Sequence, residues 1–327
     1  MGSGKINYFL KCAAALFLSA PGMRTVLTME WLLPLLAKLP LRFLQAFGAA
    51  GGEATFWLSP GYRRRTRENL RQAGYESREL FARVGRNAGR QAMESLWVWY
   101  RPVEEVLERV KATPQAEKII GQAMRSGKPI VFMTPHVGCF EVLPVWLAGR
   151  FFKETGRNIT ILYRPPKKKI LRDLVSEARQ APGIVAVPTN LSGVKTVIRN
   201  LRDGHTFGAL PDQVPHQAGE GVWANFFGRK AYTMTLPVRV AKQFDAIRIF
   251  AWGVREARGW RLEAQVWSEP LTGDLEHDAA AMNSQIEAII RRMPEQYAWS
   301  YNRYKCPRGV QRPADDVALQ ASEVKRS

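Results

Sequence analysis

"PIVFMTPHVGCFE", residues 129–141, starts as a short apolar run and continues into a turn that carries His136. An apolar run of this length between two prolines is typical of a strand that is buried on both faces. After it, segments with helix-like and strand-like patterns alternate. Helices are expected at about 139–152, 168–180 and 191–203, and strands at 158–165, 183–188 and 205–210. Strands that are joined through helices lie parallel, so the sequence predicts an α/β fold.

Three further regions complete this prediction. Residues 246–254 and 261–270 have strand-like patterns around a short turn, which indicates an antiparallel hairpin. Helical periodicity occurs at 78–98 and 102–126, and a last amphipathic helix is expected at about 278–293. We therefore expect a mixed, mainly parallel central sheet that is flanked by helices.

The charge balance favours a polyanionic partner. Lys and Arg number 48 against 29 Asp and Glu in 327 residues, a formal net charge of +19. Such an excess suits nucleic acid, anionic lipid or an acidic protein, but no nucleic-acid-binding motif is present, so no nucleic-acid partner is expected. The four histidines lack metal-ligand spacing, and neither a metal nor a cofactor is expected. Cys12, Cys139 and Cys306 are far apart and are expected to be reduced.

The N-terminal region is more apolar than the rest. Apolar stretches occur at 12–23 and 31–52, and neither has the roughly 18 charge-free residues of a typical transmembrane helix. The stretch 12–23 resembles a signal peptide but has no clear cleavage site, so we expect that it is not cleaved from the chain. Trp31 and Trp57 flank the second, as aromatic residues do at a membrane interface. We predict an N-terminal membrane-associated helical segment, with a buried core helix as the alternative. The expected divisions are a membrane-anchoring segment at 1–60, an α/β domain at 61–305 and a polar, disordered tail at 306–327.

His136 and Glu141 form a candidate catalytic pair. His136 directly follows the first predicted strand, and the crevice of an open α/β sheet lies at the carboxyl ends of its strands. Residues five apart on one helix point away from each other, so the pair requires His136 in a turn and Glu141 at a helix start. The carboxylate would then accept one ring N–H and leave the other nitrogen as a general base. A histidine that is satisfied locally at a strand end is the alternative.

Two other segments place polar residues at the same predicted edge. Arg164 follows a strand and could bind a phosphate or stabilise an oxyanion, or could form a structural salt bridge. Asp212 and Gln213 follow another strand and precede a glycine-rich loop with Trp223, Phe226 and Phe227. That loop suits a substrate with a charged head and long apolar chains, or a local hydrophobic cluster. Cys139 is expected to be a packed thiol rather than a nucleophile.

Five segments in order resemble the bacterial lipid A biosynthesis acyltransferases. They are TPHVGCFE, LYRPPKK, PDQ with GEGVWANFFG, TMTLP and MPEQYAWSYNRYK, and the resemblance covers about residues 25–306. Wider glycerolipid acyltransferases usually have Asn where this chain has Pro135, which favours the lipid A branch. In that family an H-x4-D/E motif carries the chemistry, and here it matches His136 and Glu141. By the same resemblance Arg164 matches the second motif, and Asp212, with Gln213 beside it, matches the third.

The resemblance implies an acyltransferase that moves a fatty acyl chain, lauroyl or myristoyl, from acyl carrier protein to the 3-hydroxyl of a hydroxyacyl chain. The acceptor would be a lipid A precursor in lipopolysaccharide biosynthesis, and the place of action the cytoplasmic face of the inner membrane. It also implies that His136 and Glu141 are catalytic, and that Arg164, Asp212 and Gln213 bind substrate or stabilise an oxyanion.

Other functions stay open at this stage. The acceptor could be another membrane glycolipid or phospholipid, because the motifs define the reaction more closely than the acceptor. A non-catalytic basic protein that binds a membrane or nucleic acid would also explain the charge and the apolar N-terminus.

Overall fold

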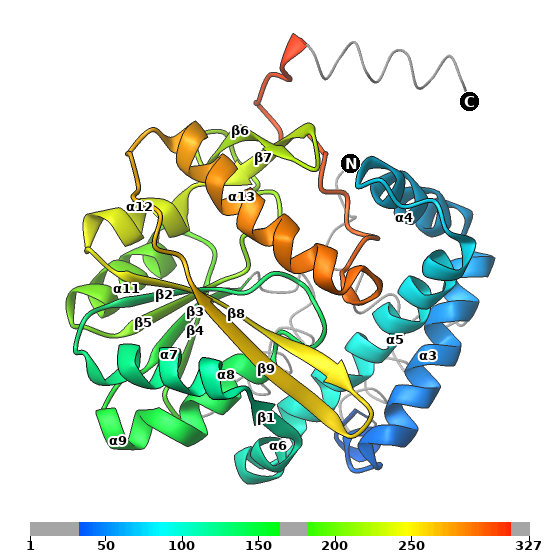
Figure 1. Ribbon diagram of the computed structural model, residues 1–327, viewed down its shortest axis with the longest axis horizontal. Helices are drawn as coiled ribbons and strands as arrows, with labels where there is room; N and C mark the ends of the chain where they lie inside the picture. The colour runs from blue at the N-terminus through cyan, green and yellow to red at the C-terminus, as the bar shows by residue number, and fades with distance from the viewer. Residues whose placement is uncertain (1–32, 164–181, 315–327) are drawn as a thin grey trace.

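The computed structural model describes residues 33–163 and 182–314, and these form an α/β fold around one central sheet (Figure 1). Within them, seven strands pair in the order β1-β9-β8-β2-β5-β3-β4. The strands are β1 (Val110–Ala112), β2 (Ile130–Met133), β3 (Ile159–Tyr163), β4 (Ile184–Pro188), β5 (Thr206–Ala209), β8 (Ile247–Glu256) and β9 (Gly259–Val266). All neighbouring pairs are parallel except the β8–β9 hairpin. The predicted mixed, mainly parallel sheet is confirmed.

The apolar run of β2 is buried because both faces of the sheet are covered. Ile130 and Phe132 belong to one hydrophobic core, and Val131 and Met133 belong to the other. Successive side chains of a strand point to opposite faces, so a strand between two helical layers must be apolar at every position. The covering helices include α7 (Pro114–Arg125) and α8 (Val142–Leu147) on one face, and α11 (Leu191–Arg202), α12 (Leu236–Gln243) and α13 (Leu275–Arg292) on the other (Figure 1).

A helical layer built from α3 (Leu41–Leu58), α4 (Pro60–Gln72) and α5 (Arg78–Tyr100) packs beside the sheet. Helices α3 and α5 approach closely through glycines, since a Cβ on Gly89 would lie only 1.9 Å from the carbonyl oxygen of Gly48. One side of α3 is therefore part of the folded body. Among the helices of residues 33–163 and 182–314, none is both long and apolar enough to cross a membrane. The apolar stretch 12–23 and the predicted helix 168–180 lie outside the described residues.

The predicted helix over 102–126 is wrong in one respect, because the structure divides it. It forms α6 (Val103–Arg109), then β1, then α7. The side chain of Thr113 accepts a hydrogen bond from the N–H of Ala116, and Pro114 occupies the first turn. Both are start signals of a new helix, so the local sequence begins α7 there rather than continuing α6.

The segment that we expected to be a loop after Gln213 contains a hairpin. Strands β6 (Gly221–Phe226) and β7 (Arg229–Met234) pair antiparallel through the two residues Phe227 and Gly228, both with positive φ. Two positive φ angles are required for the tight turn of a type I′ hairpin, and phenylalanine is an unusual residue there. The rings of Phe226 and Phe227 are buried in a core, which favours the hydrophobic-cluster interpretation of these aromatics.

Candidate active site

The register of two neighbouring strands brings His136 and Asp212 together. Met133 of β2 pairs with Ala209 of β5, so residues three positions further along each chain come opposite each other. The ring Nδ1 of His136 lies 2.8 Å from Oδ1 of Asp212, and the backbone N–H of His136 donates to Oδ2 at 3.0 Å. One carboxylate therefore holds both the backbone and the side chain of the histidine.

These contacts define the tautomer of the ring. A carboxylate accepts hydrogen bonds, so the hydrogen of the neutral imidazole must lie on Nδ1. Nε2 then carries a lone pair, and the amide nitrogen of Gln213, which can only donate, lies 2.9 Å from it. The lone pair on Nε2 is the group that could take a proton.

The site is nearly closed to solvent. The side chain of His136 is 10% exposed and that of Asp212 is 2% exposed. Burial raises the pKa of Asp212, but the charge and hydrogen bonds of His136, together with the charge of Arg303, outweigh this and lower it below its ordinary value. Burial and the nearby Asp212 charge raise the pKa of Tyr297 well above its usual range. Asp212 is thus ionised and Tyr297 neutral at neutral pH.

The turn after His136 is held by the tip of β8 and by the closing segment of the domain. Gly138 has φ of 56° and donates its N–H to the carbonyl of Gln296 at 3.0 Å. A Cβ at Gly138 would lie 2.0 Å from the carbonyl oxygen of Gly253. Both facts require glycine at this position. Residues 296 and 297 were recognised in the sequence only as part of a motif, and their contacts with the turn were not predicted.

The predicted contact between Glu141 and the imidazole ring needs a correction. We expected Glu141 to accept the ring N–H, but Asp212 takes that place. Glu141 is buried at the N-terminus of α8, in the same turn. Chain spacing pointed to a carboxylate five residues away, whereas the sheet brings one from 76 residues away.

Arg164, which directly follows β3, lies outside the described residues.

Cys139 is a packed thiol, as predicted. It is fully buried in a core, and burial raises its pKa well above the ordinary value, which disfavours the nucleophilic thiolate. No group of three or more His, Cys, Asp or Glu side chains in residues 33–163 and 182–314 is arranged to hold a metal ion.

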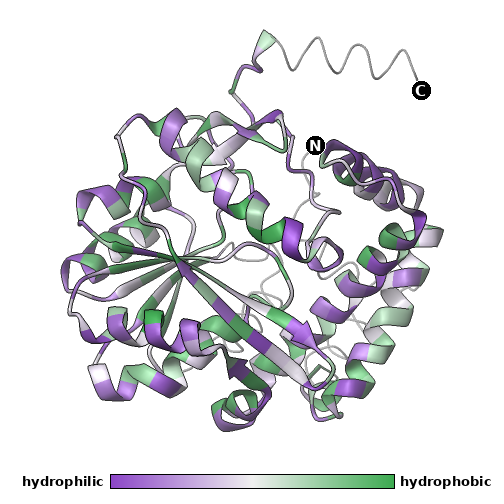
Figure 2. Cartoon of the chain, viewed as in Figure 1, coloured by the Kyte–Doolittle hydropathy of each residue, from purple (hydrophilic) through white to green (hydrophobic). Residues whose placement is uncertain are grey.

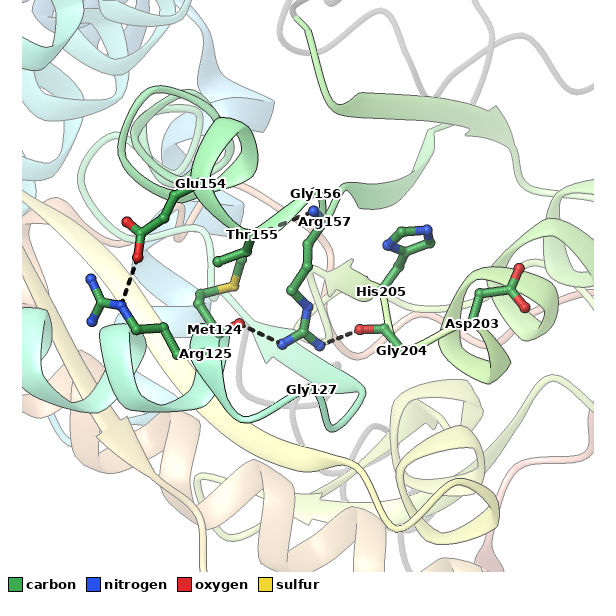
Figure 3. Close-up of a pocket in the computed structure, with 10 residues that line it drawn as sticks. All are labelled: Met124, Arg125, Gly127, Glu154, Thr155, Gly156, Arg157, Asp203, Gly204 and His205. Atoms are coloured by element: carbon green, nitrogen blue, oxygen red, sulfur yellow. Dashed lines mark hydrogen bonds and ion pairs between the residues drawn. The ribbon is translucent and has the colours of Figure 1, made fainter.

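A surface hollow lies at the opposite edge of the sheet, near the amino ends of β2, β3 and β5 (Figure 3). Arg157 lines it and donates to four backbone carbonyls, those of Ala123, Met124, Lys128 and Gly204. These bonds tie three loops together and occupy both terminal nitrogens of the guanidinium. We assign Arg157 a structural role and place the candidate active site at the other edge, with His136.

An imidazole whose Nδ1 faces a buried carboxylate, at the carboxyl edge of an α/β sheet, is the arrangement of a general base. The model of the bacterial lipid A biosynthesis acyltransferase family matches residues 18–306. The chain therefore belongs to this family.

Several curated proteins are similar to the chain. The lipid A biosynthesis acyltransferase of Haemophilus influenzae is 30% identical over 183 residues, 55% of each chain. The lipid A biosynthesis myristoyltransferase of Escherichia coli is 25% identical over 191 residues, 57% of this chain and 56% of that one. The lipid A biosynthesis palmitoleoyltransferase of Escherichia coli is 24% identical over 235 residues, 70% and 72% of the two chains. The match spans little more than half the length of the first two relatives.

Proposed function

We propose that the chain is an acyltransferase that moves a fatty acyl chain, lauroyl or myristoyl, from acyl carrier protein to a lipid A precursor. The acceptor group is the 3-hydroxyl of a hydroxyacyl chain. The observation that carries the proposal is the clamp of His136 by Asp212, which leaves Nε2 as the proton acceptor. Membership of the family supports the acceptor class.

The proposed reaction is a direct transfer without a cofactor. Nε2 of His136 takes the proton of the acceptor hydroxyl as its oxygen attacks the thioester carbonyl carbon. The new C–O bond leaves an oxyanion on the former carbonyl. Collapse of this intermediate breaks the C–S bond, and the leaving thiolate takes the proton from the imidazolium. Asp212 stabilises the imidazolium throughout, because its negative charge lies 2.8 Å from Nδ1.

Two further residues belong to the proposal. We assign Arg164, which follows the neighbouring strand β3 in the chain, to the oxyanion or to a phosphate of the acceptor. We also propose that Glu141 is catalytic, since it is a buried carboxylate at the start of α8, in the same turn as His136. Because Asp212 already accepts the hydrogen bond from Nδ1 of His136, Glu141 would act in another way than by orienting the ring.

We also propose that the protein works on the cytoplasmic face of the inner membrane, and that the outer side of α3 contacts the lipid. One side of α3 packs on α5, while Phe43, Trp57 and Leu58 are exposed by 57%, 47% and 82%. Basic residues Arg42 and Arg64 are exposed at its two ends, on α3 and α4. Figure 2 shows that α3 is mainly hydrophobic and α4 mainly hydrophilic. Exposed apolar side chains with flanking basic residues suit an anionic lipid interface.

The net charge of +19 supports both proposed partners. Acyl carrier protein is acidic and the lipid A precursor is phosphorylated, so a basic surface would attract either one.

The experiment is transfer of labelled lauroyl or myristoyl chains from acyl carrier protein to a tetra-acylated lipid A precursor, by detergent-solubilised protein. Product mass gives the number and length of added chains. We expect wild type to add one chain and His136→Ala to lose activity by orders of magnitude, while His205→Ala, at the opposite edge of the sheet, transfers normally. Transfer by His136→Ala at the wild-type rate would refute the mechanism. Transfer by wild type only to another glycolipid or phospholipid would refute the acceptor.

A further inference from the structure

The nitrogen of His136 that must accept the proton is already occupied. Asp212 holds Nδ1, and the amide nitrogen of Gln213 lies 2.9 Å from Nε2. Both contacts are made by residues of the chain itself. A neutral ring nitrogen has one lone pair in the ring plane and accepts one well-aligned hydrogen bond. An attacking hydroxyl and the Gln213 amide therefore compete for the same lone pair.

The backbone on both sides of Gln213 is anchored. Asp212 is bound to His136 through both carboxylate oxygens. On the other side, the N–H of Val214 donates to the hydroxyl oxygen of Tyr301 at 2.9 Å, and the same oxygen accepts a bond from Lys305 at 2.7 Å. The side chain of Gln213 is only partly buried. The amide can leave Nε2 by rotation of its side chain, without movement of the loop.

We propose that Gln213 is a positioning residue that caps Nε2 of His136 in the free protein and is displaced by the acceptor hydroxyl. The inference rests on the proposed function and adds to it a role for Gln213 in preventing hydrolysis of the acyl donor. An amide on Nε2 takes the place that a water molecule would otherwise fill. A water bound to the base could attack the thioester, and the donor would be hydrolysed before the acceptor arrives. The cap thus protects the acyl donor and yields only to a hydroxyl that is bound by the rest of the site.

Hydrolysis of the acyl donor without any acceptor tests this role directly. In Gln213→Ala the amide is gone and water has access to Nε2. We expect thioester hydrolysis to rise about tenfold, which corresponds to about 1.4 kcal/mol. The acceptor KM should fall or stay constant, and kcat for transfer should stay within about tenfold of wild type. Gln213→Leu fills the space with an apolar side chain, so it should remove the competition while hydrolysis rises less. Gln217→Ala, an exposed glutamine of the same loop, is the matched control and should behave as wild type.

Two outcomes overturn the proposal. If Gln213→Ala hydrolyses the donor no faster than wild type, the amide is not a cap. If instead kcat for transfer falls a hundredfold or more at constant KM, Gln213 acts on the transition state rather than on the free base. Failure of the proposed function is recognised separately, since wild type would then transfer no acyl chain to the lipid A precursor.

A spectroscopic measurement on the wild-type protein tests the same proposal if the Gln213 variants do not fold. Nitrogen-15 spectra of labelled histidine distinguish the two tautomers of a neutral ring, and His136 is identified by loss of its signals in His136→Gln. We expect the Nδ1–H tautomer, with an Nε2 signal that changes on addition of the acceptor. An Nε2–H tautomer in the free protein would contradict the cap.

Discussion

Replacement of Asp212 by asparagine keeps the shape of the side chain and removes one acceptor and the charge. In the wild-type protein both carboxylate oxygens accept hydrogen bonds, one from the ring Nδ1–H and one from the backbone N–H of His136. Asparagine has one acceptor oxygen and one donor group. If the oxygen keeps the backbone N–H, the NH₂ group faces Nδ1, which must then accept. The ring hydrogen moves to Nε2, and the proposed base of the acyl transfer is lost.

The expected effect on the rate is large. The equivalent Asp→Asn change in a serine protease triad lowers kcat by about ten-thousandfold, which is about 5.4 kcal/mol. The same tautomer argument applies here, and Asp212 is only 2% exposed, so water cannot replace the lost acceptor. We expect kcat of Asp212→Asn to fall by about a thousandfold to ten-thousandfold, with KM for the acceptor nearly unchanged.

The assay is acyl transfer measured at saturating donor and varied acceptor, with folding checked by thermal unfolding. Asp278→Asn is the matched control, because Asp278 is another buried carboxylate that accepts from Thr272 and Gly273 and lies outside the site. It should lower stability and leave kcat of the folded fraction unchanged. If Asp212→Asn keeps more than a tenth of kcat while Glu141→Gln abolishes it, Glu141 rather than Asp212 supports the base, and the reasoning is refuted.

Two other variants test the packing and the membrane contact. Glu94 is fully buried and forms a two-bond ion pair with Arg255, so Glu94→Gln should lower the free energy of unfolding in urea by about 3–5 kcal/mol. The control is Glu105, whose ion-paired side chain is 44% exposed, and Glu105→Gln should cost less than about 1 kcal/mol; equal losses would contradict the argument. Trp57→Ser should reduce the fraction of protein that sediments with anionic vesicles. Val266, at the end of β9, is exposed to a similar extent, and Val266→Ser should leave that fraction unchanged. Similar loss in both variants would argue against α3 as the contact.

The elements that the sequence predicted well are those with strong local patterns. The run 129–134 becomes β2, residues 246–270 become the β8–β9 hairpin, and 191–203 becomes α11. In each case the signal is a continuous apolar run, an alternation of apolar side chains or a helical spacing, and each of these is a property of neighbouring residues. The hairpin β6–β7 was missed because its turn uses Phe227, whose positive φ is tolerated since the ring packs into the core. Nothing in the local sequence reports such packing.

The sequence by itself determined the α/β class, the place of His136 after a buried strand and the family resemblance, because these depend on local patterns and on the order of motifs along the chain. Only the tertiary structure decided which carboxylate orients the histidine. Asp212 reaches His136 through the pairing of β2 with β5, while Glu141 is closer in the chain and does not receive the ring N–H. Strand order and register are long-range properties of the folded sheet, so they decide which carboxylate lies beside His136.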